Sequence, residues 1–354
     1  MIDEKTFAYE NIKRIQNDYK VDPELAQRAI FALGLVEALK RVGADFIFKG
    51  GSSLMLLFET PKRLSTDVDI IVEENYDIDS FIKKASIIFP FVSVEESIRK
   101  TAKNISKKHY RFHYVSPIKN KEITVLLDVL FSSNHYAKTI KKPIKNAFLI
   151  NKGEDLYIDI PSVESILGDK LTAFAPHTIG INYYNEDFSN DKRLEVIKQF
   201  YDVVSLLDIA SNFDEVRKTY FEIANEEIKY RSIDATPEDC LLDTFYTSLS
   251  LLSWGKFRSN DYRNLVDGVN KIKLHIVNRD FNMNSTALCS SKVMLLSACI
   301  LTNNNIFDLN IKNKEPIKEA PYNKINFILK NKEIIAFNYA STAIEMIKDI
   351  LSSK

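Results

Sequence analysis

The stretch KGGSSLMLLF at residues 49–58, followed by RLSTDVDIIV at residues 63–72, decides the fold of this chain. Before it, the short apolar run DFIFKG (45–50) predicts a buried strand that ends at a pair of glycines. The following SSLMLLFE predicts a helix, and VDIIVEE predicts a second strand. The sequence therefore indicates a strand–turn–helix unit beside a second buried strand.

The glycine pair, Gly50 and Gly51, lies where the first strand hands over to the helix. Glycine there allows positive φ and leaves room for a phosphate to approach backbone N–H groups at the helix N-terminus. Ser52 and Ser53 follow and add hydroxyl donors. The pattern is typical of a phosphate-binding turn, although a plain turn with a helix cap explains the same residues.

Two carboxylates, Asp67 and Asp69, are separated by one residue where the second strand begins. Side chains alternate along a strand, so both are expected on one face. Asp128 interrupts the otherwise apolar strand EITVLLDVLF (122–131) and joins them if the two strands are neighbours. Carboxylates sharing divalent cations suit phosphoryl transfer, so we predict a magnesium site. A solvated strand end, or a carboxylate paired with Lys or Arg, is the alternative.

The remaining pattern predicts an α+β fold in two domains. An Asp-Pro start and helical apolar spacing predict a helix over 22–42, and further elements follow up to about residue 150. From IPSVESILGDKLTAFA onward, helical patterns dominate. We expect a catalytic domain with a mixed sheet and N-terminal helices over 1–160, and a mainly helical domain over 161–354 that completes the active-site cleft.

Composition excludes several classes of protein. Hydrophobic residues are 45% and charged residues 27% of the 354, and the formal net charge is zero, so neither disorder nor general nucleic-acid adhesion is favoured. No run of about 18 apolar residues occurs, and the N-terminus lacks a signal-peptide pattern, so we expect a cytoplasmic protein without membrane contact. The cysteines, Cys240, Cys289 and Cys299, are expected to be buried free thiols.

Basic residues concentrate between residues 97 and 145, a segment that contains twelve Lys and Arg residues but two acidic residues. Such a run is either a solvated face or a surface that grips a polyanion such as RNA. His109 and His113, four residues apart on an expected strand, share a face, and we interpret them as a half-buried strand face rather than metal ligands.

Taken together, KGGSSLMLLF and RLSTDVDI resemble the signature of the AbiEii/AbiGii nucleotidyltransferase toxin family, within the polymerase-β superfamily. That family shows a Lys-Gly-Gly-Ser/Thr start, a helix, and an Arg-x-Ser-x-Asp-x-Asp element. The matching residues are Lys49, Gly50, Gly51, Ser52, Arg63, Ser65, Asp67 and Asp69. A later helix lysine of the family matches Lys170 in GDKLTAF, and its Arg-Asp-x-x-Asp element matches KQFYDV in part, with Lys198, Gln199 and Asp202. The resemblance covers about residues 25 to 208.

The resemblance implies that a nucleoside triphosphate binds with two Mg²⁺ ions and passes a nucleotidyl group to an acceptor hydroxyl. The implied nucleotide-binding residues are Gly50, Gly51, Ser52, Ser53, Arg63, Lys170 and Asp202. The implied catalytic residues are Asp67, Asp69, Asp128 and Lys170, and the three aspartates are the metal ligands. Lys170 would neutralise triphosphate charge, although a surface lysine is the commoner state. Asp202 would position the acceptor or form a helix cap or salt bridge, and Arg63 would touch phosphate or orient Asp67.

Three functions remain open at this point. The first is a toxin that transfers a nucleotide to RNA, for example a tRNA end, and has a cognate antitoxin. The second is nucleotidylation of a protein hydroxyl by the same chemistry. The third is a catalytically silent nucleotide-binding or interaction module, and retention of all three carboxylates counts against it.

Overall fold

The computed structural model describes residues 1–97, 106–185, 189–330 and 333–352. The chain divides into two compact units, which we treat separately. Unit 1 comprises Met1–Ser162 and Leu274–Asp280, and unit 2 comprises Val163–Lys273 and Phe281–Lys354. Within the described residues, no helix combines the length and apolar character needed to cross a membrane.

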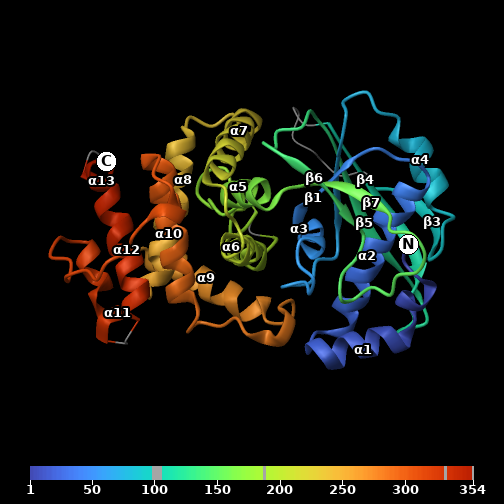
Figure 1. Cartoon of the computed structure of the whole chain (residues 1–354), viewed down its shortest axis with the longest axis horizontal. Helices are drawn as coiled ribbons and strands as arrows, with labels where there is room; N and C mark the ends of the chain where they lie inside the picture. The colour runs from blue at the N-terminus through green and yellow to red at the C-terminus, as the bar shows by residue number, and fades with distance from the viewer. Residues whose placement is uncertain (98–105, 186–188, 331–332, 353–354) are drawn as a thin grey trace. The chain divides into compact units, whose positions relative to one another are not determined.

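Unit 1 is built on a mixed seven-stranded sheet with the strand order β3-β4-β5-β2-β1-β7-β6 (Figure 1). The pairs β2/β5 and β1/β7 are parallel and the other neighbours are antiparallel. The strands are β1 (Ile47–Lys49), β2 (Val68–Val72), β3 (Phe91–Glu96), β4 (Lys107–Val115), β5 (Glu122–Phe131), β6 (Thr139–Pro143) and β7 (Tyr157–Pro161).

One face of this sheet is the core of unit 1. Burial along β5 alternates, so that Val125, Leu127 and Val129 are fully buried while Leu126 and Asp128 are only partly covered. The apolar face packs against α2 (Pro23–Arg41), which contacts both β2 and β5. The polar side chains of these strands therefore share the opposite face.

Local sequence explains where α2 begins. Asp22 caps the helix by accepting a hydrogen bond from the Leu25 N–H at 2.9 Å, and Pro23 occupies the first turn, where its missing N–H costs nothing. The other helices of unit 1 are α1 (Tyr9–Tyr19), α3 (Gly50–Ser53) and α4 (Ile78–Ala85), with 3₁₀ turns at Glu4–Phe7, Leu54–Leu56 and Val277–Arg279.

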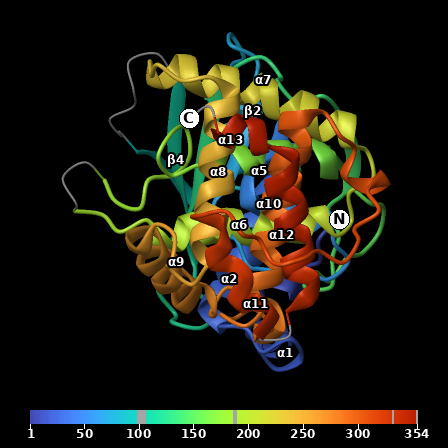
Figure 2. The same cartoon turned by 90° about the vertical axis from the view of Figure 1, so that its left-hand side faces the viewer.

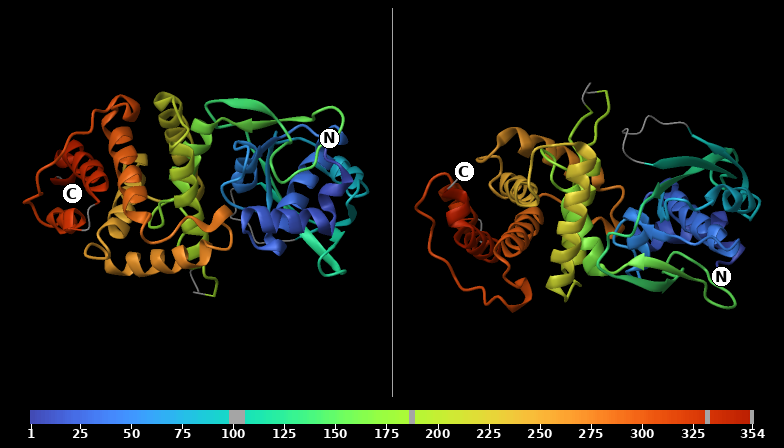
Figure 3. Two further views of the ribbon diagram at one scale, coloured as in Figure 1. Left: turned by 60° about the horizontal axis from the view of Figure 1, so that its bottom comes forward. Right: turned by 90° about the horizontal axis from the view of Figure 1, so that it is seen from above.

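The named secondary-structure elements of unit 2 are all helices in its described residues, with irregular connections between them. Its α-helices are α5 (Val163–Ala173), α6 (Arg193–Leu207), α7 (Phe213–Arg231), α8 (Pro237–Leu252), α9 (Ser259–Ile272), α10 (Thr286–Thr302), α11 (Phe327–Lys330), α12 (Ile334–Met346) and α13 (Lys348–Ser352). Short 3₁₀ turns occur at Ile306–Asp308 and Tyr322–Asn326. Helix α10 packs between α8 and α12 (Figure 2), and α5 lies against α7 (Figure 3).

The predicted α+β fold with a mixed sheet is confirmed, and the predicted elements over 22–42 and 122–131 are observed with nearly the same bounds. The helix expected over SSLMLLFE is shorter: after Ser53 the backbone tightens into a 3₁₀ turn, in which the Leu57 N–H bonds to the Leu54 carbonyl at 3.1 Å. Strand β6 was not predicted, because its lysines and terminal proline suit an edge strand and hide the apolar pattern.

The expectation of buried free thiols is correct for two of the three cysteines. Cys240 and Cys299 are buried, whereas Cys289 is only half-buried, and all three are free. Burial raises the pKa of the Cys299 thiol to about 12, because a thiolate is poorly solvated there.

Gly168 of α5 permits the close contact with α7. A methyl group at this position would lie 2.7 Å from the Val216 carbonyl oxygen and 2.8 Å from the Tyr220 backbone nitrogen. We predict that Gly168→Ala lowers the free energy of unfolding by about 1–3 kcal/mol, because this overpacking outweighs the helix-propensity gain of about 1 kcal/mol. Urea denaturation measures the change. A variant more stable than the parent would contradict the close α5–α7 packing.

Candidate active site

The turn between β1 and α3 brings the glycine pair against residues 63–69, the segment that carries Asp67 and Asp69. Gly50 has a φ of +75°, as the sequence pattern predicted, and a Cβ atom there would lie 2.2 Å from Asp69 Oδ2. At Gly51, a Cβ atom would lie 2.7 Å from both Arg63 Nη2 and Ser65 Oγ. Both glycines are therefore required sterically, because the acidic segment passes directly over the turn.

The two serines after the glycines are fully buried and bond to nearby backbone. The Ser52 hydroxyl donates to the Asp67 carbonyl oxygen, and the Ser53 hydroxyl donates to the Gly50 carbonyl oxygen at 2.9 Å. The Ser52 bond joins the turn to the segment that carries the carboxylates, and the Ser53 bond stabilises the turn itself. Phosphate binding by either hydroxyl stays a prediction.

Strand register places two of the three predicted carboxylates side by side. Strands β2 and β5 are parallel neighbours, and Asp69 is the direct partner of Asp128. Both side chains are half-buried on the face opposite the core. Asp67 lies two residues earlier, just before β2 begins, and is exposed. The two strands are thus neighbours, which was the condition for Asp128 to join the other carboxylates.

The carboxylates beside the glycine turn are the donors available to the magnesium that the family resemblance implies. In the described part of the chain, no group of three or more His, Cys, Asp or Glu side chains converges closely enough to hold a metal ion. Mg²⁺, however, is usually held by one or two carboxylates together with waters and substrate phosphates. The side-by-side pair of Asp69 and Asp128 fits that mode, whereas a preformed cage of three protein ligands is not seen.

Basic side chains and a histidine surround the carboxylate pair on the same face. Lys49 on β1 is the register partner of Asp69, and His109 on β4 is the register partner of Asp128. The His109 Nδ1 atom lies 2.7 Å from Asp128 Oδ1. Lys107 and Arg111 lie two residues to either side of His109 and therefore share its face. No sequence motif assigned His109 to the site, because a contact between two neighbouring strands leaves no local motif.

Unit 2 brings together the residues that match the later family motif. The Lys170 ammonium donates to Gln199 Oε1 at 2.9 Å and forms an ion pair with Asp202 at 3.3 Å. The Lys170 side chain is 8% exposed and that of Asp202 is 1% exposed. A buried pair of this kind fixes α5 against α6, so the salt-bridge alternative for Asp202 is what the geometry shows. Contact of either residue with nucleotide stays a prediction.

Some of the basic residues of the segment 97–145 pair with acids where the structure describes it. Ion pairs join Lys108 to Asp79 at 2.5 Å and Arg111 to Glu95 at 3.2 Å. Two further pairs are Lys119–Glu24 at 2.5 Å and Lys141–Asp159 at 3.8 Å. Lys107, Lys121 and Lys145 are exposed. Three other members of the predicted patch, Arg99, Lys100 and Lys103, lie outside the described residues.

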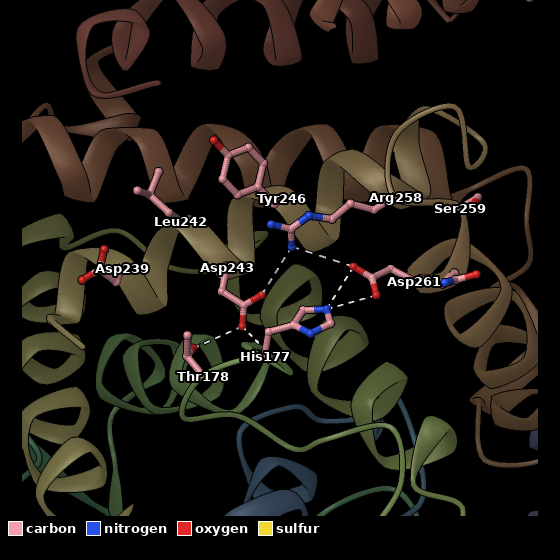
Figure 4. A pocket seen from close by; sticks show the side chains of 10 residues that line it. His177, Thr178, Asp239, Leu242, Asp243, Tyr246, Arg258, Ser259 and Asp261 are labelled. Carbon is pink, nitrogen blue, oxygen red and sulfur yellow. Dashed lines mark hydrogen bonds and ion pairs between the residues drawn. The ribbon is translucent and has the colours of Figure 1, made fainter. Parts of the chain in front are cut away.

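Unit 2 also contains a polar pocket of about 590 Å³ that no sequence motif indicated (Figure 4). His177 Nε2 lies 3.0 Å from each carboxylate oxygen of Asp261. Asp243 accepts hydrogen bonds from the His177 backbone N–H at 2.8 Å and from the Thr178 hydroxyl at 3.1 Å. Arg258 lies 3.9 Å from Asp243 and 3.8 Å from Asp261. These residues are far apart in sequence, so only the fold assembles them.

The electrostatics of this pocket depend on two buried carboxylates. The hydrogen bond to Asp261 raises the pKa of His177 above its usual value, although burial acts in the opposite direction. Burial raises the pKa of Asp243, because the charged form loses hydration. The polar groups of the pocket mainly engage one another, which favours a structural network that joins α8 to α9.

The His177 pair predicts a pH-dependent contribution to stability. A raised folded-state pKa means that the protonated imidazole stabilises the fold below the unfolded-state pKa of about 6.5, and that this contribution is lost as pH rises through the folded-state pKa. We expect His177→Gln to lower Tm most at pH 5.5 and least at pH 9. Thermal melts across this range measure the difference.

A matched variant for this experiment is His135→Gln, because the His135 ring lies against the Ser132 and Ser133 hydroxyls rather than a carboxylate. Its Tm difference from the parent should not vary with pH in the same way. A His177→Gln difference that is constant from pH 5.5 to pH 9 would contradict the proposed charge pairing.

Comparison with known proteins places these observations in a family. Residues 35–271 match the family model described as "Nucleotidyl transferase AbiEii toxin, Type IV TA system". The match includes Asp67, Asp69, Asp128, Lys170 and Asp202, and it extends beyond the region over which the sequence resemblance was recognised. No match is found among curated proteins.

Solved structures are similar only remotely. Protein JHP933 from Helicobacter pylori has 12% sequence identity and a TM-score of 0.44, over 78% of this chain and 93% of that one. An antigenic nucleotidyltransferase-like protein from Paracoccidioides brasiliensis has 17% identity and a TM-score of 0.36, over 60% of this chain and 90% of that one. The family match, which spans more than half of the chain, carries the assignment: the chain belongs to the AbiEii nucleotidyl transferase toxin family and is by class a nucleotidyltransferase.

Proposed function

We propose that this chain is a magnesium-dependent toxin that transfers a nucleotide from a nucleoside triphosphate to a hydroxyl of RNA, for example at a tRNA end. The observation that carries the proposal is the register of β2 and β5, which sets Asp69 beside Asp128 under the Gly50–Gly51 turn. The type IV toxin–antitoxin family supports a cognate antitoxin as a partner.

The reaction requires an acceptor hydroxyl and a triphosphate held in line. The hydroxyl oxygen forms a bond to the α-phosphorus, the bond from that phosphorus to the bridging oxygen breaks, and pyrophosphate leaves with the electron pair. Asp128 is the candidate acceptor of the hydroxyl proton, because its carboxylate lies on the open face beside Asp69. Asp69 on β2 and Asp67 just before it would hold divalent cations.

Magnesium bound at these carboxylates would lower the pKa of the attacking hydroxyl and neutralise charge on the phosphates. The side chains around the carboxylates also favour an anionic substrate, independently of a bound magnesium ion. Lys49, Lys107 and Arg111 place cations on the same face as the carboxylates, and such cations stabilise polyphosphate and attract nucleic acid. This distribution favours RNA over a protein as the acceptor.

Labelled nucleotides test the proposal and identify the acceptor. The chain would be incubated with Mg²⁺, total RNA or total protein, and each triphosphate labelled at either the α- or the γ-phosphate. Label on RNA from the α-phosphate alone supports nucleotide transfer to RNA. Label on a protein would replace RNA with a protein acceptor, and label from the γ-phosphate would refute nucleotidyl transfer.

We predict that Asp69→Asn and Asp128→Asn each reduce transfer by about 100-fold or more, because the amide keeps the shape but loses the charge that binds the cation. Growth arrest of a host that expresses the chain should disappear with either variant and with Asp67→Ala. Glu227→Gln is the control, since it makes the same charge-to-amide change in an ion pair with Arg231 on α7, which the proposal does not involve. Full transfer activity in Asp69→Asn would refute the proposal.

We predict that Gly50→Ala reduces transfer by about 10–100-fold, because the new methyl group must displace the Asp69 carboxylate. The matched control is Gly153→Ala. Gly153 also has a positive φ, of +66°, but nothing lies within 4 Å of its would-be Cβ atom. Both variants carry similar backbone strain, so equal activities of the two would show that the contact with Asp69 is unimportant.

A further inference from the structure

His109 is held beside Asp128 by the register of two long strands. The pair His109–Asp128 stands between the pairs Lys108–Val129 and Tyr110–Leu127 of the β4/β5 ladder. Tyr110, Leu127 and Val129 are buried on the core face, which fixes both strands. The Tyr110 hydroxyl and the Lys108 ammonium also bond to Asp79 and tie β4 to α4. The imidazole position is therefore set by the core and not by a flexible loop.

The geometry of the pair defines which atom donates. His109 Nδ1 is 2.7 Å from Asp128 Oδ1, and a carboxylate can only accept, so the Nδ1–H donates. The His109 side chain is 11% exposed, whereas that of Asp128 is 33% exposed. The imidazole thus lies deeper than the carboxylate and supports it from one side. Such a bond restricts rotation of the carboxylate plane.

We propose that His109 is a positioning residue, whose Nδ1–H holds the Asp128 carboxylate in the orientation that binds a divalent cation. The inference rests on the function proposed above. Groups that hydrogen-bond to a metal-binding carboxylate fix its orientation, and their loss typically weakens metal affinity or activity about 10–100-fold. His109 would act through Asp128 and would touch neither nucleotide nor acceptor.

The same strand offers a matched control. His113 lies four residues further along β4 on the same face, and its Nδ1 atom is 2.6 Å from Glu122 Oε1. The two histidines make the same kind of bond to a carboxylate of the neighbouring strand. Only the His109 partner belongs to the carboxylate pair. Removing His113 therefore reproduces the loss of a strand-to-strand bond without touching Asp128.

Binding of Mn²⁺ to the full-length chain, followed by the electron paramagnetic resonance signal of the free ion, measures the effect without requiring turnover. We expect His109→Ala to weaken Mn²⁺ binding at least tenfold, and His113→Ala to change it less than twofold. His109→Asn should restore most of the affinity, because its side-chain nitrogen occupies the same δ position and can donate to Asp128. Thermal melts of each variant check that the fold is retained.

The outcomes separate the positioning role from the proposed function. If the parent chain binds Mn²⁺ and His109→Ala binds it equally well, the positioning role is wrong and the proposed function stands. If His109→Asn is as weak as His109→Ala, a hydrogen bond from the δ nitrogen is not the cause and the inference also fails. A parent chain that binds no Mn²⁺, with or without a triphosphate, would overturn both.

Discussion

The pairing of β2 with β5 is the constraint on which the rest of unit 1 depends. Its parallel register sets Asp69 directly beside Asp128, while the alternating Val68, Leu127 and Val129 are buried against the core. A shift of one residue in either strand would send a carboxylate into the apolar core and an aliphatic side chain to the open face. The hydrophobic core and the polar site are therefore determined by the same register.

The turn before α3 depends on this register in a second way. Glycine at positions 50 and 51 leaves space for Asp69, Arg63 and Ser65, because a Cβ atom at either position would clash with them. The buried Ser52 hydroxyl then holds the Asp67 backbone to the turn. Glycines, serine and carboxylates thus form one steric unit, in which each part restricts where the others can lie. These contacts therefore hold the backbone of the candidate site in one arrangement.

The ionic groups on the sheet face of unit 1 differ in kind from those inside unit 2. On the sheet face of unit 1, cations and carboxylates remain partly exposed, and their charges can act on a ligand. In unit 2, the Lys170–Asp202 pair is buried, and the buried Asp243 and Asp261 are engaged by His177, whose own side chain is partly exposed. Buried polar groups that satisfy each other order a helical core more than they attract a ligand.

The sequence by itself determined the α+β class, the strand and helix of the glycine turn, and the carboxylates of β2 and β5, because these features follow from local periodicity and residue type. Only the tertiary structure decided that Asp69 is opposite Asp128 and that His109 lies beside Asp128. It also decided that residues 274–280 belong to unit 1, where Ile276 pairs with Arg63. The assembly of His177 with Asp243 and Asp261 belongs to the same group. The physical reason is that strand order, register and contacts between distant helices arise from packing over long sequence separations, which leaves no periodic pattern in the chain.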